Sequence, residues 1–467
     1  MRFALAAALA ALISGSALAA ERTLSADEAK ALEIFRTIIS IRTAEKHGKM
    51  PEMAAYLAGE LKKAGFPKKD VMIRPLGETA SLVVRYKGDG SSGKKPILFM
   101  AHMDVVDALP EDWELDPFTL TEKDGFFFGR GVTDNKYGVA NLTQTFIRLK
   151  KEGFVPNRDL FLVFSGDEET EMKTTRALAA DPELKAAEFA LNTDAGGGSI
   201  GPDGKPLVYG VQAAEKTYAD FEITATNPGG HSSRPRDDNA IYDLAAAIAR
   251  VQALRFPVMS NDITRASFAA TGAGLGGDLG AAMIAFSKNP SDKKAAARIS
   301  ADPAYVGLTR TTCVATQLKA GHAPNALPQT ATANVNCRIF PGMSVDDVKA
   351  ALAKAIGDDK LAIKVLREPT VSPISAPRED VAAAVGKAVH ARYDGLPMVV
   401  YMESGGTDGM HFRTAGVPTY GVSAIFMKEA DGFAHGLNER LPVDAFYAGL
   451  DHWMTIIKAL AGPQAGE

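Results

Sequence analysis

The sequence lacks the features that mark several large classes of protein. Only two of its 467 residues are cysteine and neither lies in a Cys-x-x-Cys pair, which argues against a cysteine-based metal site. There is no basic run of the kind found in nucleic-acid-binding segments, and 52 basic residues are balanced by 56 acidic ones. Beyond the N-terminus no stretch reaches the ~20 apolar residues of a membrane-spanning helix. We therefore expect neither a nucleic-acid partner nor a membrane partner.

Apolar residues, in contrast, are plentiful. They make up 46% of the chain, which argues against disorder, and the net charge is only −4. A chain of 467 residues is too long for one ordinary hydrophobic core. The composition therefore predicts a globular protein of two domains.

The first 19 residues have the pattern of a signal peptide. Met1-Arg2 supplies a positive start, Phe3 to Ile13 an apolar core that is too short to span a membrane, and Ala17-Leu18-Ala19 a small-residue cleavage site. We expect residues 1–19 to be removed and the mature protein to be exported, either periplasmic or secreted.

The two cysteines, Cys313 and Cys337, lie in predicted strands that flank a loop near Asn325. An exported protein can form a disulfide, and a hairpin would place the two residues opposite each other. A disulfide and two buried free thiols both remain open on the sequence alone.

The hydrophobic pattern divides the mature chain into three parts. In residues 20–215, apolar strands alternate with amphipathic helices, which predicts an α/β fold: a mostly parallel sheet with helices on both faces. Residues 216–371 instead give a β-α-β-β-α-β order, which is typical of a separate α+β domain with an antiparallel sheet. The first pattern resumes over residues 372–467, so one domain is inserted into another. The segment 257–308 has no clear period.

Acidic residues and histidines follow the predicted strands of the first domain. Each could be an ordinary cap or loop residue, but ligands collect at the carboxyl ends of strands in open α/β sheets. The set comprises His102 and Asp104, Asp134, Asp167-Glu168-Glu169, Asp194 and His435. Zinc takes histidine nitrogen and carboxylate oxygen, so the sequence favours a zinc site at this edge.

A pair of zinc ions would balance the charge of this set. Two dications carry +4, and Asp134, Glu169 and Asp194 with one bridging hydroxide supply −4. Glu168 then remains without a metal, in the position of a general base for a water whose pKa the metals lower toward ~7. Asp104, two residues after His102, is suited to orient that imidazole.

Eight motifs in this order resemble those of the dizinc exopeptidases, a family that includes glutamate carboxypeptidase, carboxypeptidase S, aminoacylase, succinyl-diaminopimelate desuccinylase and carnosinase-type dipeptidases. They are HMDVV, GRGVTDNK, SGDEE, NTDAGGG, GGHSS, NALP, GGTD and AHGLNE. The resemblance covers essentially the whole mature chain. It implies that the metal ligands are His102, Asp134, Glu169, Asp194 and His435. It also implies that Asp134 bridges two metals, that the Asp134–Asn135 peptide bond is cis, and that Glu168 is the general base.

The resemblance also assigns substrate contacts. By residue type alone, we would expect His231 to be an exposed loop histidine and Arg338 to be a solvated arginine of a strand. In the family, the residue matching His231 crosses the dimer interface to polarise the scissile carbonyl, and the residue matching Arg338 grips the substrate carboxylate. Asn325, Gly406 and Thr407 match further substrate contacts. The inserted domain is expected to act as a lid and to form a homodimer.

The sequence departs from the family pattern after Asp194, where Ala195 replaces the acidic residue of many relatives. Asp rather than Glu at position 194 is the dipeptidase and carboxypeptidase S variant and argues against the desuccinylase branch. We expect a carboxypeptidase or dipeptidase with two zinc ions per chain, cobalt or manganese being possible substitutes. It would hydrolyse a peptide bond next to a free carboxylate. An N-acyl-amino-acid amidohydrolase is the second hypothesis, and an inactive binding protein is a remote third.

Overall fold

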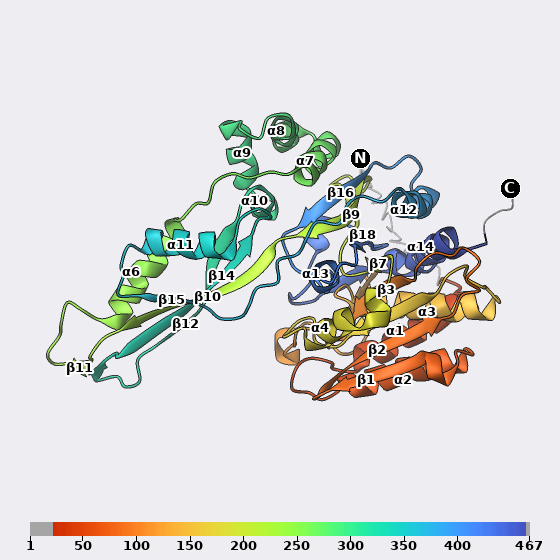
Figure 1. Ribbon diagram of the computed structural model, residues 1–467, viewed down its shortest axis with the longest axis horizontal. Coiled ribbons are helices and arrows are strands. Elements are labelled where there is room, and N and C mark those ends of the chain that lie inside the picture. The colour runs from red at the N-terminus through yellow and green to blue at the C-terminus, as the bar shows by residue number, and fades with distance from the viewer. Residues whose placement is uncertain (1–21, 464–467) are drawn as a thin grey trace, which may run out of the picture.

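The computed structural model describes residues 22–463, so the predicted signal peptide lies outside the described residues. A large sheet with helices on both sides forms the main body, and a smaller sheet extends away from it (Figure 1). The predicted α/β fold class is confirmed. The chain leaves the large sheet at Glu215, and the smaller sheet begins at Thr217. The domain division at residues 216–371 stays a prediction.

The large sheet has ten strands, and its centre is parallel. The order is β1-β2-β6-β3-β7-β17-β9-β8-β18, with β16 paired to β9. β3 runs parallel to both β6 and β7, and β17 runs parallel to β7. The strands are β1 (Val71–Leu76), β2 (Thr79–Tyr86), β3 (Ile97–His102), β6 (Leu160–Ser165), β7 (Phe189–Asn192), β8 (Gly197–Ile200), β9 (Pro206–Glu215), β16 (Met398–Glu403), β17 (Thr419–Gly421) and β18 (Phe426–Met427).

Alternating side chains of the central strands enter two different cores. In β3, Phe99 faces one core and Met100 the other, because successive side chains of a strand point to opposite faces. This is why these strands are apolar throughout. Helices α1 (Ala26–Ser40), α2 (Met50–Lys63), α3 (Lys136–Lys151), α12 (Glu379–Arg392) and α14 (Val443–Ala461) cover the first face. Helices α4 (Lys173–Ala180), α5 (Pro182–Lys185) and α13 (Gly409–Thr414) cover the second.

The smaller sheet is antiparallel, with the order β12-β14-β10-β15. Its strands are β10 (Thr217–Thr226), β12 (Thr312–Ala320), β14 (Thr330–Ile339) and β15 (Ala362–Val365). Helices α6 (Ala240–Ala253) and α11 (Val345–Ile356) pack on it around a separate core that includes Phe221, Leu244 and Leu352. We call this sheet with its two helices the lid. Its β-α-β-β-α-β order is the predicted one.

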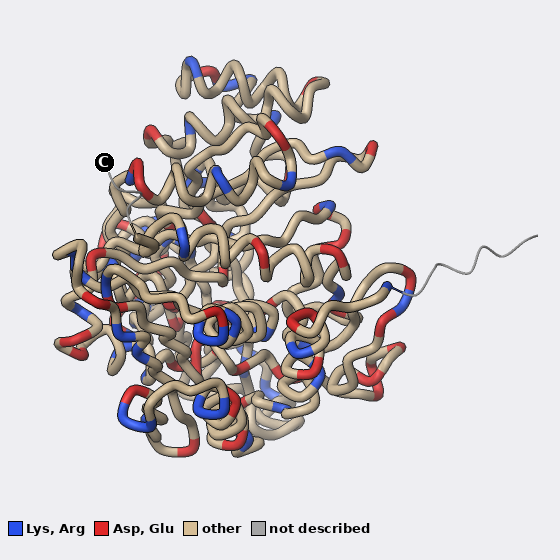
Figure 2. Tube along the Cα trace, turned by 90° about the vertical axis from the view of Figure 1, so that its right-hand side faces the viewer, with Lys and Arg blue, Asp and Glu red and all other residues tan. Residues whose placement is uncertain are grey.

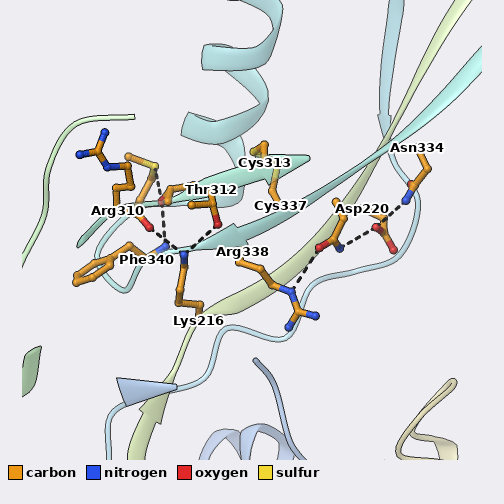
Figure 3. Close-up of a disulfide and its surroundings, with 12 residues drawn as sticks. Lys216, Asp220, Arg310, Thr312, Cys313, Asn334, Cys337, Arg338 and Phe340 are labelled. Carbon is orange, nitrogen blue, oxygen red and sulfur yellow. Dashed lines mark hydrogen bonds between the residues drawn. A yellow bond between two sulfur atoms is a disulfide. The ribbon is translucent and has the colours of Figure 1, made fainter. Parts of the chain in front are cut away.

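Cys313 and Cys337 lie directly opposite each other in β12 and β14 and form a disulfide (Figure 3). Of the two alternatives left open by the sequence, the structure shows the bonded one. The bond joins the edge strand of the lid to its neighbour, one residue away from Arg338.

The segment without a clear period forms four helices, α7 (Asp262–Leu275), α8 (Gly277–Lys288), α9 (Lys293–Ser300) and α10 (Pro303–Val306). They have a small core of their own, and α7 packs against β16 and β9. Small residues let α7 and α8 approach closely: a Cβ added to Gly272 would lie 2.7 Å from the carbonyl oxygen of Gly280. Glycine backbone makes part of the contact beside the aromatic pair Phe268 and Phe286, so the apolar pattern of the two helices is interrupted.

Short strands complete the fold. β4 (Thr121–Lys123), β5 (Phe126–Phe128) and β19 (Arg440–Pro442) form one small sheet, and β11 (Gly230–His231) pairs with β13 (Ala326–Leu327). Between residues 22 and 463, no helix combines the length and hydropathy needed to cross a membrane. In the view of Figure 2, basic and acidic residues are interspersed along the chain.

Candidate metal centre

The parallel strands β3, β6 and β7 end at the same edge of the sheet, and each leads into an acidic or histidine residue. His102 is the last residue of β3, Glu168 and Glu169 lie in the turn after β6, and Asp194 follows β7. Because these three strands are neighbours, their carboxyl ends bring together residues far apart in the sequence. Asp134 joins them from the residues before α3, and His435 from the loop before β19.

Asp134 lies between the two histidines. Its Oδ1 is 2.8 Å from Nε2 of His102, and its Oδ2 is 3.0 Å from Nε2 of His435. The same nitrogen of His435 is 2.9 Å from Oε1 of Glu169, and Nε2 of His102 is 3.4 Å from Oδ1 of Asp194. The Asp134 carboxylate thus has potential metal ligands on both sides, which is the arrangement that a ligand bridging two metals requires.

These donors fit divalent cations. Two sets, His102–Asp134–Glu169 and His102–Glu168–Asp194, each have ligand atoms within 4.8 Å of one another. Burial raises the pKa of Asp194 to about 7 and that of Glu168 well above its usual range. The hydrogen bonds that His435 donates to the carboxylates of Asp134 and Glu169 raise its pKa to about 10. Four acidic groups packed this closely favour a strong positive charge among them, and nitrogen with carboxylate oxygen is the set that zinc prefers.

Asp104 supports two parts of the centre. Its carboxylate accepts hydrogen bonds from the backbone N–H groups of Glu168, at 3.0 Å, and Glu169, at 2.9 Å. Nδ1 of His102 is 3.0 Å from the backbone oxygen of Asp104 and 3.5 Å from its carboxylate. The sequence predicted only the contact with His102. The structure shows a second contact, with the backbone of the turn that carries Glu168 and Glu169.

The Asp134–Asn135 peptide bond is cis, as the family resemblance implied. The Asn135 side chain accepts a hydrogen bond of 2.9 Å from the hydroxyl of Thr193, the residue before Asp194. Gly138 permits this contact, because a Cβ at that position would lie 2.0 Å from the Thr193 hydroxyl oxygen. The hydrogen bond and the close approach therefore connect the start of α3 to the end of β7 beside the metal centre.

Glu439 has a role that the sequence did not predict. It is fully buried and accepts hydrogen bonds from the backbone N–H groups of Gly131, Thr133 and Asp134 at 2.8–3.1 Å. Arg130 donates to the same carboxylate at 2.9 Å. Glu439 thus fixes the backbone that presents Asp134. In the sequence, Arg130 and Glu439 are charged residues inside the motifs GRGVTDNK and AHGLNE. That they pair with each other is shown only by the fold.

We expect Glu439→Gln to weaken metal binding by roughly 10- to 100-fold, the usual effect of losing a group that orients a ligand. An amide has one acceptor oxygen in place of two, so it cannot serve all the donors that surround Glu439. Competition between the protein and a chelator measures the change. Glu429→Gln is the control, because Glu429 is an exposed residue at the start of a short 3-10 helix. An unchanged metal affinity in folded protein would contradict this role.

A cleft of about 1320 Å³ lies over the metal centre, and the lid forms one of its walls. Asp134, Glu168, Glu169, Asp194 and His435 line it. Arg338, Gly406 and Thr407, three of the predicted substrate residues, line it as well. The guanidinium of Arg338 stacks over the ring of Tyr218, 4.7 Å from its centroid, because the two residues are cross-strand partners in β14 and β10.

His231 and Asn325 lie elsewhere, at the tip of the lid. His231 is in β11 and exposed, and the backbone N–H of the next residue, Ser232, donates to the carbonyl oxygen of Asn325 at 3.0 Å. Figure 1 shows β11 at the end of the lid that is farthest from the large sheet. The structure therefore places these two residues together, but away from the metal centre of their own chain.

The sequence model of peptidase family M20/M25/M40 matches residues 98–459 of this chain. The chain belongs to this family. It is 29% identical over 372 residues to the N-fatty-acyl-amino acid synthase/hydrolase PM20D1 of Xenopus tropicalis, which covers 78% of this chain and 72% of the relative. It is 27% identical to the probable carboxypeptidase S-like 2 of Dictyostelium discoideum, over 91% of this chain and 82% of the relative.

Solved structures agree on the fold. The M20 family metallo-carboxypeptidase Sso-CP2 of Sulfolobus solfataricus superposes with a TM-score of 0.69 at 18% identity, covering 92% of this chain and 99% of that one. With the family established, the chain is a metal-dependent hydrolase of peptide or amide bonds.

Proposed function

We propose that this M20 peptidase is a dizinc exopeptidase, a carboxypeptidase or dipeptidase, that cleaves a peptide bond next to a free carboxylate. The observation that carries the proposal is that Arg338 shares a cleft with the candidate metal centre. A guanidinium is a planar double donor suited to a carboxylate, so it would fix the end of the substrate while the scissile bond lies over the metals.

The residues of this chain divide the chemical work. His102, Asp134, Glu169, Asp194 and His435 would hold two zinc ions, which supply Lewis-acid activation of water and of the scissile carbonyl. Glu168 lines the cleft beside them and acts as the proton shuttle: it accepts a proton from the attacking water and delivers it to the leaving amine. Arg338, Gly406 and Thr407 position the substrate.

His231 would complete the site from a second copy of the chain. Because it lies at the tip of its own lid, it can stabilise the developing oxyanion only in a neighbouring site. The lid has surfaces that suit a homodimer. β12 is an edge strand with Val314 and Leu318 exposed, and α6 exposes Tyr242. Asn325, beside His231, would approach the same substrate.

The second candidate is an N-acyl-amino-acid amidohydrolase. Its support is the name of the PM20D1 relatives, which act on N-fatty-acyl amino acids, together with apolar side chains in the cleft. Met172, Val371 and Met410 line it alongside the charged residues. Both candidates use the same metal centre and the same carboxylate contact, and they differ in the acyl group accepted. The remote third candidate, an inactive binding protein, requires a metal centre that does not hydrolyse.

We also propose that the protein is exported after removal of residues 1–19. The support is the charged start, apolar core and small-residue site of that segment.

A panel of matched substrates tests the proposed function. Purified mature protein with zinc should hydrolyse dipeptides or N-acyl amino acids that end in a free carboxylate, and the C-terminal amides should react roughly 100-fold more slowly. Arg338→Ala should remove most of that preference, mainly by raising KM. Equal rates on acids and amides would contradict the proposed carboxylate contact. The acyl group hydrolysed fastest distinguishes the two candidate functions.

A further inference from the structure

Glu215 and Arg413 form an ion pair where the chain crosses from the large sheet to the lid. Glu215 is the last residue of β9, and β10 begins two residues later. The side chain of Glu215 is fully buried and that of Arg413 is 2% exposed. Neither has a role in the proposed reaction. Buried ion pairs often add little stability, so this one is best explained by what it holds in place.

The Glu215 carboxylate holds the loop that contains Gly406 and Thr407. One oxygen accepts from Nη1 of Arg413, and the other accepts from the backbone N–H of Thr407 at 2.7 Å. A hydrogen bond to a charged acceptor in a buried setting is a strong one. Gly406 lies next to the substrate arginine: a Cβ added to it would be 3.8 Å from Nη1 of Arg338. The position of the loop therefore sets the space on one side of that guanidinium.

The other side of Arg338 is set by the same crossing. Tyr218, three residues after Glu215, lies opposite Arg338 in the sheet and stacks against it. The intervening Lys216 fixes this strand, because its backbone N–H donates to the carbonyl oxygen of Glu403 and its buried Nζ donates to the carbonyl oxygen of Arg310 at 2.8 Å (Figure 3). The strand that carries Tyr218 thus begins two residues after Glu215, and the Glu215 side chain holds the loop on the other side of the guanidinium.

Arg413 anchors Glu215 to the rest of the main body. Its Nη2 donates to the side-chain oxygen of Gln212 at 2.6 Å and to the backbone oxygen of Thr419 at 3.0 Å. Its Nε donates to the hydroxyl of Ser375 at 3.2 Å, in the segment by which the chain returns from the lid. The pair therefore joins both crossings between main body and lid.

We propose that Glu215 is a positioning residue that sets the gap between the Gly405–Thr407 loop and Arg338, and with it the fit of the substrate carboxylate. This inference rests on the proposed function, because Arg338 is there the carboxylate contact. It adds a residue that touches no substrate and yet controls discrimination between acids and amides.

Glu215→Gln tests the inference with a side chain of nearly the same size. The amide offers one oxygen to two donors, so its NH₂ must face either Arg413 or the Thr407 N–H. We expect KM for a substrate with a free carboxylate to rise about tenfold while kcat changes less than about threefold. The preference for acid over amide should fall by a similar factor, and the zinc content should stay the same.

Two further variants separate positioning from general stability. Leu352→Ala, in the core of the lid, should lower the melting temperature and leave the acid preference unchanged. Replacing Glu215 and Arg413 together by Met removes both charges at once, a change that buried pairs commonly tolerate, and should lower the preference as Glu215→Gln does. An unchanged preference in either folded Glu215 variant, or equal losses on acid and amide, would overturn the inference. A wild-type protein without acid preference would instead overturn the proposed carboxylate contact.

Discussion

Glu168→Gln should retain two zinc ions per chain and lose kcat by roughly 10³- to 10⁴-fold. Glu168 lines the cleft close to His102 and Asp194, but it is not one of the five ligands proposed above. Its replacement should therefore remove proton transfer and leave those five ligands in place. An amide is nearly isosteric with the carboxylate but cannot accept the proton. Steady-state kinetics together with zinc analysis measure the two quantities on one preparation.

Glu171→Gln is the matched control for Glu168→Gln. Glu171 lines the same cleft three residues further on, and its carboxylate is paired with Lys173. We expect its kcat to stay within about twofold of the wild-type value, because a partly exposed ion pair contributes little. A Glu168→Gln variant with full zinc content and undiminished turnover would refute the proton-shuttle role.

His231→Ala should lower kcat by roughly 10²- to 10³-fold without altering zinc content, the effect expected when one oxyanion donor is lost. Because the proposed contact is made across a dimer, mixing His231→Ala with Glu168→Gln should restore activity. In a mixed dimer, one site has Glu168 from one chain and His231 from the other. Random exchange of equal amounts would recover about a quarter of wild-type activity.

His322→Ala provides the control for this experiment, since His322 is another exposed histidine of the lid, in the loop between β12 and β13. It should remain fully active. A fully active His231→Ala variant would show that this histidine is an ordinary exposed residue. Two inactive variants that exchange subunits and stay inactive would contradict the contact across the dimer.

The fold and the grouping of the site followed from patterns that are local in the sequence. The apolar runs that end at His102 and before Glu168 and Asp194 predicted parallel strands, and parallel strands end at one edge. The structure brings those residues together with Asp134 and His435. The strongly periodic helices and the β-α-β-β-α-β sequence of elements in the lid were predicted for the same reason.

Features that depend on contacts between distant segments could not be predicted in this way. The helices α7 and α8 pair partly through Gly272 and Gly280, which carry no periodic apolar signal, beside the aromatic pair Phe268 and Phe286. The function of Glu439 depends on a backbone turn that is 305–308 residues away in the sequence. Glu215 is the last residue of a strand that the periodicity did not reveal, and its partner Arg413 lies in an unpredicted short helix. Local sequence patterns show where the charged residues are, but they do not show which distant residue each one contacts in the fold.

A zinc titration of the metal-free protein tests the central claim, that this family member is a dizinc hydrolase. Hydrolysis of a dipeptide or N-acyl amino acid with a free carboxylate should be absent without metal, rise with added zinc and level off at two ions per chain. Hydrolysis that persists after complete metal removal, or two bound zinc ions without hydrolysis of any such substrate, would contradict it.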